Sequence, residues 1–178
     1  LSELTSLVQK TIFSISNEDS RFTLNGALLQ VADGGMTMVS TDGHRLALAH
    51  QPGSAGDAPP SKALLPKKAM VELLKIAGEA GGEDVKIEYA SDDNHLFFRL
   101  GDRLLMSRKL TGNFPDYERV LPRSHAHSIT LNKEEFRQTI ERVAQFADER
   151  TRAIKVRLAD NEAKIHSSLS ETGESEES

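Results

Sequence analysis

An internal repeat is the feature that most constrains the fold of this 178-residue chain. The stretch Leu29–Gly34 reads Leu-Gln-Val-Ala-Asp-Gly, and Val156–Asn161, 127 residues later, reads Val-Arg-Leu-Ala-Asp-Asn. In both stretches an apolar strand ends at a turn, and a second apolar strand is expected to follow. A long-period repeat of this kind is typical of chains built from copies of one supersecondary unit. We therefore expect one structural plan to recur along the chain.

Hydrophobic periodicity gives that plan. Residues 1–51 predict a helix and three strands, and residues 62–110 predict a strand, a helix and three strands. The segment 51–60, rich in Pro, Gly and Ala, is expected to connect the two sets. The expected elements are helices at 3–15 and 66–77, and strands at 21–32, 35–40, 44–51, 63–65, 85–89, 95–100 and 103–110.

A third copy is expected after the proline-bounded link 114–122. The stretch His127–Leu131 predicts a strand, and Asn132 predicts the N-cap of a helix that continues to about Ala147. This copy is expected to end after two strands, in a Glu/Ser tail. Those strands are predicted at 154–158 and 163–166.

The fold class that follows is α+β, with repeated β-α-β-β-β units whose helices pack on antiparallel sheets. The first helix has no leading strand before Leu1, and the third copy is cut short. We therefore expect a fragment truncated at both ends, with two domains at 1–122 and 123–178.

Composition excludes several classes of protein. With 38% hydrophobic and 28% charged residues the chain has ordinary globular usage. No apolar run approaches the roughly 18 residues that a membrane span needs, and no signal peptide is evident, so we expect a cytoplasmic protein without a membrane role. The absence of cysteine excludes disulfides, thiolate metal sites and a cysteine nucleophile. No cofactor is expected.

The net charge of −5 is concentrated at the C-terminus. The last eight residues contain four glutamates, so the remaining body is nearly neutral. A neutral body argues against tight nonspecific binding in a DNA groove, but it permits a looser contact that encircles the duplex. The four glutamates are Glu171, Glu174, Glu176 and Glu177.

The segment Thr41–Leu46 is the most site-like stretch of the sequence, because an Asp-Gly turn is followed at once by His44 and Arg45. Asp-Gly is a strong reversal signal between apolar runs. Two interpretations therefore stay open from local physics alone: the turn only reverses the chain, or it presents His44 and Arg45 to a partner.

Three ordered motifs connect this segment to a known family. They are Leu24-Asn25-Gly26, then Thr41 to Leu46, then Phe114-Pro115-Asp116-Tyr117. Together with the nested repeat, they make the chain resemble the bacterial DNA polymerase III beta subunit family, the sliding clamps. The resemblance covers essentially the whole chain, from the middle domain into the third. It implies a three-domain protomer that forms a head-to-tail dimeric ring around duplex DNA.

The resemblance also implies a groove for partners. In the family this groove receives short linear motifs of the replicative polymerase catalytic subunit, the clamp loader, repair polymerases and mismatch-repair proteins. Its other wall comes from late strands of the third domain, which lie beyond Ser178. Apolar members can hold a Leu or Phe anchor, and cationic members can orient peptide carbonyls. The matching positions are Leu24, Thr41, Gly43, His44, Arg45, Leu46, Pro115, Arg119 and Val120.

Two further surfaces are implied by the same resemblance. The end of the third helix, Gln145 and Phe146, corresponds to part of the family's dimer interface. Helical cations would face the encircled double-stranded DNA, in contacts to phosphate and water and without sequence preference. These cations are Lys10, Lys67, Lys68, Lys75, Arg137 and Arg142.

Two rival functions stay possible. A metal hydrolase is suggested only by six histidines, including His125 and His127, and no carboxylate is spaced to complete that site. No catalytic motif of a hydrolase or nucleotide-binding enzyme is present, so we expect a noncatalytic protein. The second rival, a structural adaptor with no DNA role, shares the fold prediction and differs only in its partners.

Overall fold

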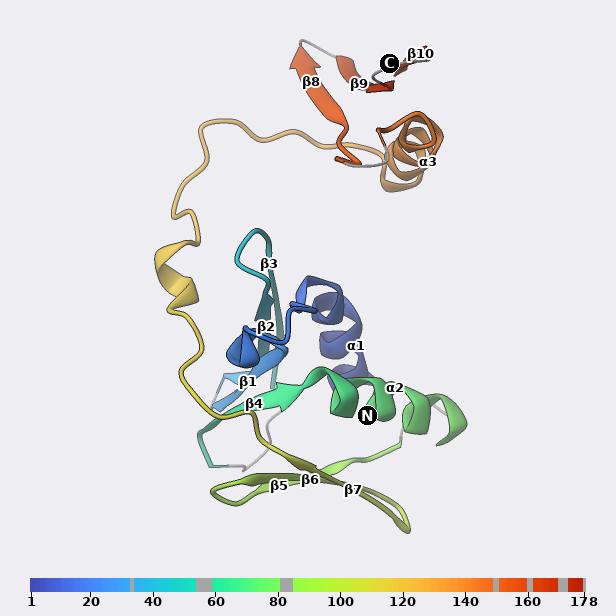
Figure 1. The fold of residues 1–178 in the computed structure, drawn as a ribbon. Coiled ribbons are helices and arrows are strands. Elements are labelled where there is room, and N and C mark those ends of the chain that lie inside the picture. Colours follow the sequence, from blue (N-terminus) through green and yellow to red (C-terminus); the bar gives the residue numbers. More distant parts are fainter. Residues whose placement is uncertain are drawn as a thin grey trace. The chain divides into compact units, whose positions relative to one another are not determined.

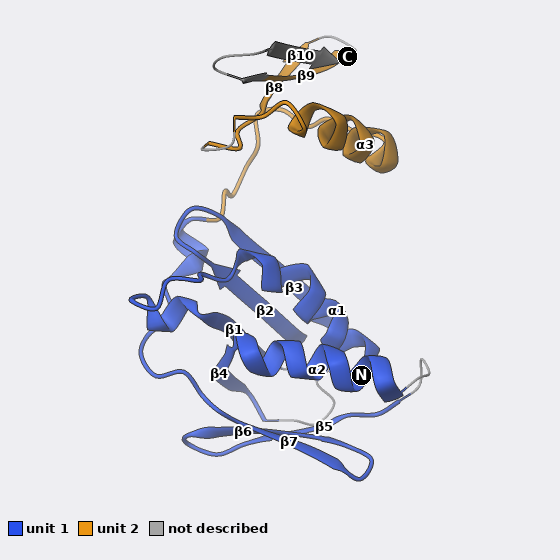
Figure 2. Ribbon diagram, turned by 45° about the vertical axis from the view of Figure 1, so that its right-hand side comes forward, with its two compact units in different colours: residues 1–120 blue, residues 121–178 orange. Residues whose placement is uncertain are grey.

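The computed structural model describes residues 1–32, 34–53, 59–80, 85–148, 151–159, 162–169 and 173–177. The backbone divides into two compact units, residues 1–120 and 121–178 (Figure 2).

The part of unit 1 that the structure describes forms two antiparallel sheets (Figure 1). The larger has four strands in the order β3-β2-β1-β4, and the smaller has three in the order β5-β6-β7. In the larger sheet β1, β2 and β3 pair in chain order, whereas β4 pairs with β1 on the other side; in the smaller sheet β5, β6 and β7 pair in chain order. The strands are β1 (Gly26–Ala32), β2 (Gly35–Thr41), β3 (Leu46–Pro52), β4 (Ser61–Pro66), β5 (Glu88–Ser91), β6 (His95–Leu100) and β7 (Arg103–Arg108).

Two helices cover the core face of the larger sheet. Helix α1 (Ser2–Thr11) contacts β2 and β3, helix α2 (Lys67–Ala80) contacts β4, and the helices contact each other (Figure 2). Each helix turns one apolar stripe inward, as the spacing of its residues predicts. The buried apolar residues of these stripes are Leu4, Leu7 and Val8 on α1, and Ala69, Met70 and Leu73 on α2.

Strand β1 has both faces covered. Ala27, Leu29 and Val31 alternate into the core under the helices. On the opposite face, strand register aligns one residue of each strand in an apolar row that crosses the whole sheet. The row consists of Leu48, Val39, Leu28 and Leu64, in the order β3-β2-β1-β4.

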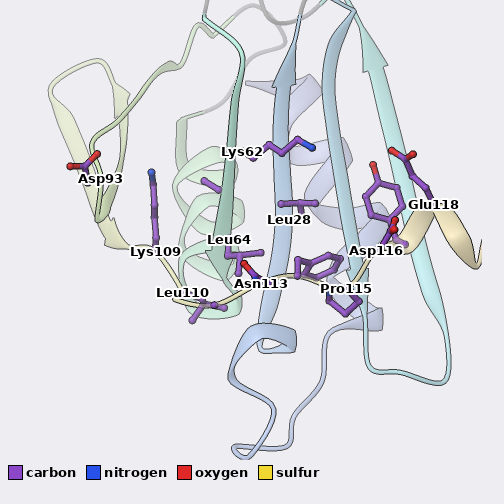
Figure 3. A pocket seen from close by; sticks show the side chains of 14 residues that line it. Leu28, Lys62, Leu64, Asp93, Lys109, Leu110, Asn113, Pro115, Asp116 and Glu118 are labelled. Atoms are coloured by element: carbon purple, nitrogen blue, oxygen red, sulfur yellow. The ribbon is translucent and has the colours of Figure 1, made fainter.

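The segment after β7 lies on this second face. We call residues 109–120 the link. Its Leu110 amide donates to the Leu64 carbonyl at 3.1 Å, and its Tyr117 hydroxyl donates to Gln30 Oε1 at 2.7 Å. Val39, in the middle of the apolar row, is fully buried. The link therefore holds a position over the face of the sheet that is turned away from the helices (Figure 3).

Unit 1 corrects three sequence-based boundaries. The predicted strand 21–32 starts only at Gly26, because Phe22–Leu24 forms a 3-10 turn in which the Leu24 amide bonds the Arg21 carbonyl at 2.8 Å. The predicted strand 85–89 is shifted to Glu88–Ser91 by its register with β6. Helix α1 stops at Thr11 and continues as a 3-10 turn, Ile12–Ser14.

The described residues of unit 2 form one helix and a three-stranded antiparallel sheet. The side chain of Asn132 accepts bonds from the amides of Glu134 and Glu135 at 3.0 and 3.1 Å, which confirms the predicted N-cap. The buried Val143 of the helix lies above the sheet, where its carbonyl accepts a bond from Ser167 Oγ at 2.8 Å. The elements are α3 (Lys133–Ala144), β8 (Lys155–Ala159), β9 (Glu162–Leu169) and β10 (Gly173–Glu177).

Two predictions for the third copy are wrong. The third copy is predicted to end after two strands, but Gly173–Glu177 forms a further strand with β9, because backbone hydrogen bonding outweighs the weak strand preference of Glu and Ser. The predicted strand His127–Leu131 is exposed and irregular, since it has no partner among the described strands. The turn predicted at Asp160 and Asn161 lies outside the described residues.

We predict that the core of unit 1 depends on Phe98, which is 2% exposed and has its ring 5.4 Å from that of Tyr89. Phe98→Ala should lower the free energy of unfolding by about 3–5 kcal/mol, because it leaves a cavity in a closed core. Urea unfolding at neutral pH measures this. Phe97→Ala is the matched control on the other face of β6, and an equal loss in both variants would contradict the assignment of faces.

Candidate peptide-binding groove

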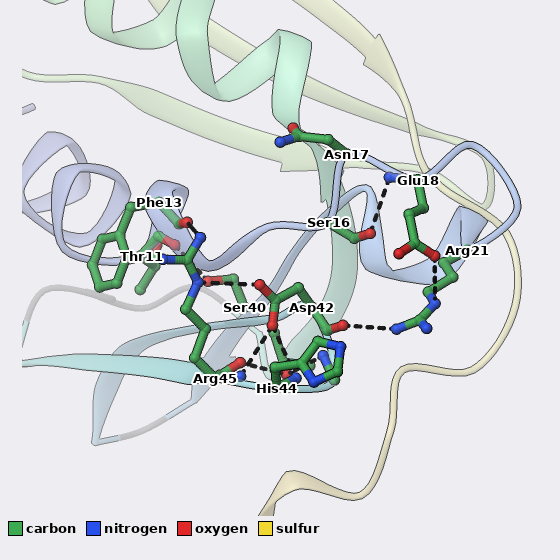
Figure 4. Close-up of polar contacts among 12 residues, drawn as sticks. Thr11, Phe13, Ser16, Asn17, Glu18, Arg21, Ser40, Asp42, His44 and Arg45 are labelled. Atoms are coloured by element: carbon green, nitrogen blue, oxygen red, sulfur yellow. Dashed lines mark hydrogen bonds and ion pairs between the residues drawn. The ribbon is translucent and has the colours of Figure 1, made fainter. Parts of the chain in front are cut away.

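The loop between β2 and β3 is built around Asp42. One carboxylate oxygen, Oδ1, accepts bonds from the amides of His44 and Arg45 at 2.9 and 3.0 Å. Thr41 completes the loop, since its Oγ1 accepts from the Gly43 amide at 3.0 Å and donates to the Arg45 carbonyl at 2.7 Å. Side chains of the loop itself therefore satisfy its backbone groups, as short polar residues commonly do in turns (Figure 4).

The negative charge of Asp42 strengthens these hydrogen bonds in the loop. The backbone amides of Arg45 and His44 lower its pKa from 3.8 to about 2, and the Arg45 guanidinium acts in the same direction. Both amides bind the ionised form better than the neutral one. Asp42 is thus an anion throughout the physiological range, and the loop is most strongly held when it is ionised.

Arg45 connects the loop to the 3-10 turn that follows α1. Its Nε donates to Asp42 Oδ2 at 3.1 Å, its Nη2 donates to the Phe13 carbonyl at 2.8 Å, and its guanidinium carbon lies 5.8 Å from the centre of the Phe13 ring. The side chain is nevertheless 60% exposed. Arg45 therefore combines a structural bridge with a cationic surface that a partner can reach.

Gly43 meets a backbone requirement at the tip of the loop. Its φ is +89°, in the region that favours glycine, and a Cβ there would lie 3.0 Å from Arg21 Nη1. That same Arg21 atom donates to the Asp42 carbonyl at 2.8 Å. The loop is thereby tied to the 3-10 turn that carries Leu24, which is 9% exposed.

The structure brings together most of the predicted groove residues from the first half of the chain. Thr41 pairs with Leu46 in the β2–β3 register, His44 and Arg45 are exposed at the tip, and Leu24 is joined to them through Arg21. Leu46 is half-buried on the same face of the sheet as the apolar row. Thr41 and Leu46 therefore lie on the face of the sheet that the link crosses.

The link supplies the remaining three predicted groove residues. Pro115 lies over the sheet, and the 3-10 turn Tyr117–Arg119 then leads to Val120, which is 69% exposed. Arg119 pairs with Asp116 at 2.7 Å. Arg119 and Val120 are therefore presented at the surface by a turn that is closed by its own ion pair.

A cleft of about 540 Å³ lies beside the link. Leu28, Leu64 and Phe114 contribute its apolar lining, and Lys62 and Lys109 approach it from the β4 side (Figure 3). Of the nine predicted groove residues, Pro115 alone lines this cleft. This cleft is thus adjacent to the predicted groove and does not coincide with it.

The predicted DNA-facing cations differ in their surroundings. Lys10, Lys68 and Lys75 are exposed on α1 and α2, whereas the Lys67 ammonium donates to Asn17 Oδ1 at 2.7 Å. In unit 2, Arg137 bonds Glu134 and Glu141, and both carboxylates raise its pKa. Arg142 donates from Nη2 to Thr139 Oγ1 at 3.1 Å.

The two predicted interface residues end helix α3. Gln145 is the C-cap, with its amide bonded to the Arg142 carbonyl at 3.4 Å, and Phe146 is 45% exposed. An exposed aromatic side chain at a helix end is available to a partner surface.

Sequence reasoning missed the residues that support the groove. The sequence pattern predicts Asp42 only as part of a turn, and it predicts no supporting role for Phe13, Arg21, Gln30 or Tyr117. The sequence contains a signal for Asp42, because an aspartate followed by two or three loop residues commonly bonds their amides. The other four act across long sequence separations, and no local pattern marks them.

Comparison with protein families identifies the family of this chain. Residues 1–116 match the family model of the DNA polymerase III beta subunit, central domain, and residues 118–178 match that of the DNA polymerase III beta subunit, C-terminal domain. The chain belongs to the DNA polymerase III beta subunit family. This confirms the family that the three sequence motifs indicated.

Individual relatives agree. The beta sliding clamp of Pseudomonas aeruginosa is 32% identical over 99% of this chain and 47% of its own length, and that of Caulobacter vibrioides is 37% identical over 86% and 42%. A crystal structure of the Pseudomonas aeruginosa subunit superposes with a TM-score of 0.90 at 31% identity, covering 99% of this chain and 48% of that one. The predicted α+β clamp fold is confirmed, and the chain spans about half the length of the curated relatives it matches.

No described helix has the length and apolar character to cross a membrane. Nor does the described part of the chain gather three or more His, Asp or Glu side chains in a metal-binding arrangement. His125 and His127, the pair that suggested a metal hydrolase, are both exposed.

We predict that Asp42→Ala lowers the free energy of unfolding by about 1–2 kcal/mol at pH 7, because two loop amides lose their acceptor. The pKa of Asp42 is lowered on folding, so its contribution is full above about pH 4 and is lost as the pH falls toward 2.

Urea unfolding of both proteins between pH 2 and 7 measures this difference. Asp42→Asn is the matched control, since its amide oxygen can still accept from the loop amides. A difference between the wild-type protein and Asp42→Ala that stays constant down to pH 2 would contradict the role given to the ionised carboxylate.

Proposed function

We propose that this chain is the middle domain and the beginning of the third domain of a sliding clamp, a noncatalytic processivity factor for a replicative DNA polymerase. The domains would be residues 1–122 and 123–178. The observation that carries the proposal is the shared face of unit 1, where the Thr41–Leu46 loop and the link lie on the same side of one sheet.

The proposed mechanism is topological linkage. A ring that encircles duplex DNA replaces dissociation into bulk by sliding, so its affinity for any one DNA sequence can be weak. A nearly neutral body suits this task, because strong attraction to phosphates would slow movement along the duplex. Partners would then be held to DNA through the ring and exchanged at the groove.

DNA would be faced by the helices. The exposed Lys10, Lys68 and Lys75 of unit 1 are the best supported contacts, because each presents an ammonium on a helix surface. Arg137 is the weakest, since two carboxylates already share its guanidinium. Contacts to phosphate through such cations carry no base preference.

Partners would bind the groove through short linear motifs. Leu24, Leu46, Pro115 and Val120 offer the apolar contacts for a Leu or Phe anchor. At the rim, His44, Arg45 and Arg119 would orient peptide carbonyls, and the guanidinium groups of Arg45 and Arg119 would attract acidic flanking residues. The proposed partners are the polymerase catalytic subunit, the clamp loader, repair polymerases and mismatch-repair proteins.

Two relatives lend chemical support. A structure of the Pseudomonas aeruginosa clamp has griselimycin bound, and one of the Caulobacter crescentus clamp has polyethylene glycol at a proposed beta-motif tethering region. These relatives are 31% and 33% identical to this chain. We further propose that the longer protein forms a homodimeric ring through a surface including Gln145 and Phe146, and that it acts in the cytoplasm.

The test is fluorescence polarisation with a labelled peptide that carries a Leu-Phe pair, compared with the same peptide after both residues are changed to alanine. We predict binding that depends on the Leu-Phe pair. Leu46→Ala combined with Val120→Ala should weaken it at least tenfold, because both apolar contacts are removed.

Leu104→Ala is the matched control, since Leu104 is 58% exposed on β7, away from the groove. It should leave the affinity unchanged. Equal binding of both peptides, or equal weakening by the control variant, would count against the groove.

A further inference from the structure

The link is attached to the sheet at two points. From Asn113 to Val120, Phe114 and Tyr117 are half-buried and every other residue is exposed. Burial of its own side chains cannot fix the backbone position of a segment this exposed. Its position must come from specific contacts at its ends.

The first attachment lies at the start of the link. The Leu110 amide donates to the Leu64 carbonyl at 3.1 Å, which extends the pairing at the edge of β4. Two residues later Gly112 has a φ of +106°, and a Cβ there would lie 2.6 Å from Thr23 Cγ2. The backbone of the link thus passes directly against the turn that carries Leu24.

The second attachment is the hydrogen bond from Tyr117 Oη to Gln30 Oε1, at 2.7 Å and partly buried. Gln30 stands on the outer face of β1, and its register partners on that face are Thr37 and Lys62. Burial, together with Glu118 and Asp116, raises the pKa of Tyr117, so its hydroxyl keeps the proton that it donates. The bond joins residues 87 positions apart.

The turn that follows transmits this attachment to the groove. The Val120 amide bonds the Tyr117 carbonyl at 3.1 Å, and Arg119 pairs with Asp116 at 2.7 Å. The segment from Asp116 to Val120 is therefore one compact turn centred on Tyr117. Wherever Tyr117 is fixed, the two groove residues after it are fixed as well.

We infer that Tyr117 and Gln30 are positioning residues of the peptide groove, because their hydrogen bond sets where Arg119 and Val120 stand relative to the Thr41–Leu46 loop. This inference rests on the proposed function. Neither residue needs to touch the peptide. Their effect on affinity comes from holding one wall of the groove in place before the peptide arrives.

Tyr117→Phe and Gln30→Leu test this in the 178-residue chain, with the Leu-Phe peptide described above. Each should weaken binding about fivefold, the equivalent of one neutral hydrogen bond. The double variant should be no weaker than either single one, because both remove the same bond. In contrast to Gln30→Leu, Gln30→Glu should bind the peptide as tightly as the wild-type chain does. Its carboxylate oxygen can still accept the bond, and Lys62 lies beside it in register.

Tyr89→Phe is the matched control. The Tyr89 hydroxyl is buried and has no hydrogen-bond partner among the described residues, so its removal should not change the affinity. Hydrogen exchange gives a readout that does not need the peptide: the Val120 amide should exchange several-fold faster in Tyr117→Phe, while core amides of β1 should not change.

The outcomes separate the two claims. If the wild-type chain does not bind the peptide in a Leu-Phe-dependent way, the Thr41–Leu46 loop and the link do not form a peptide groove in this chain, so the proposed groove fails and the inference fails with it. If the wild-type chain binds and Tyr117→Phe binds equally well, the inference alone is overturned. Unchanged exchange at Val120 would also overturn it, because the bond would then not be what holds the turn.

Discussion

The two-sided burial of β1 is the constraint on which the rest of unit 1 depends. One set of alternating residues, including Leu29, closes the core against the helices, while Leu28 and Gln30 on the other set receive the link. A shift of one residue in register would exchange the two sets and expose the core. The same strand thus determines both where the hydrophobic core forms and where a groove can be built.

The hydrogen bonding of the Asp42 loop recurs elsewhere in unit 1, whereas the surroundings of this loop are specific to it. Asp92 forms the same arrangement between β5 and β6, with Oδ1 accepting from the amides of Asn94 and His95 at 2.8 and 2.6 Å. The turn alone therefore does not mark a site. What distinguishes the first loop is its surroundings: Arg45 bonds the 3-10 turn that follows α1, and the link lies on the same face of the sheet.

Much of the fold could be predicted from the sequence, because helical and strand periodicities are local. The repeat helped because each copy is expected to contain the same order of helices and strands. The family could be inferred from three ordered motifs. Errors arose where pairing overrode composition, as in the Glu/Ser strand β10, or where a strand lacked a partner, as at 127–131. In the groove, Thr41 and Leu46 were accessible to sequence reasoning, whereas the contact of Tyr117 with Gln30 depends on tertiary packing.

The most direct test of the central claim is to map, by backbone amide chemical shifts, where the Leu-Phe peptide binds on the 178-residue chain. The account predicts that the largest changes fall in two separate segments, Thr41–Leu46 and residues 116–120, and that they saturate together with one affinity. Changes confined to the outer face of β5–β7, or to only one of the two segments, would contradict a groove shared between the loop and the link.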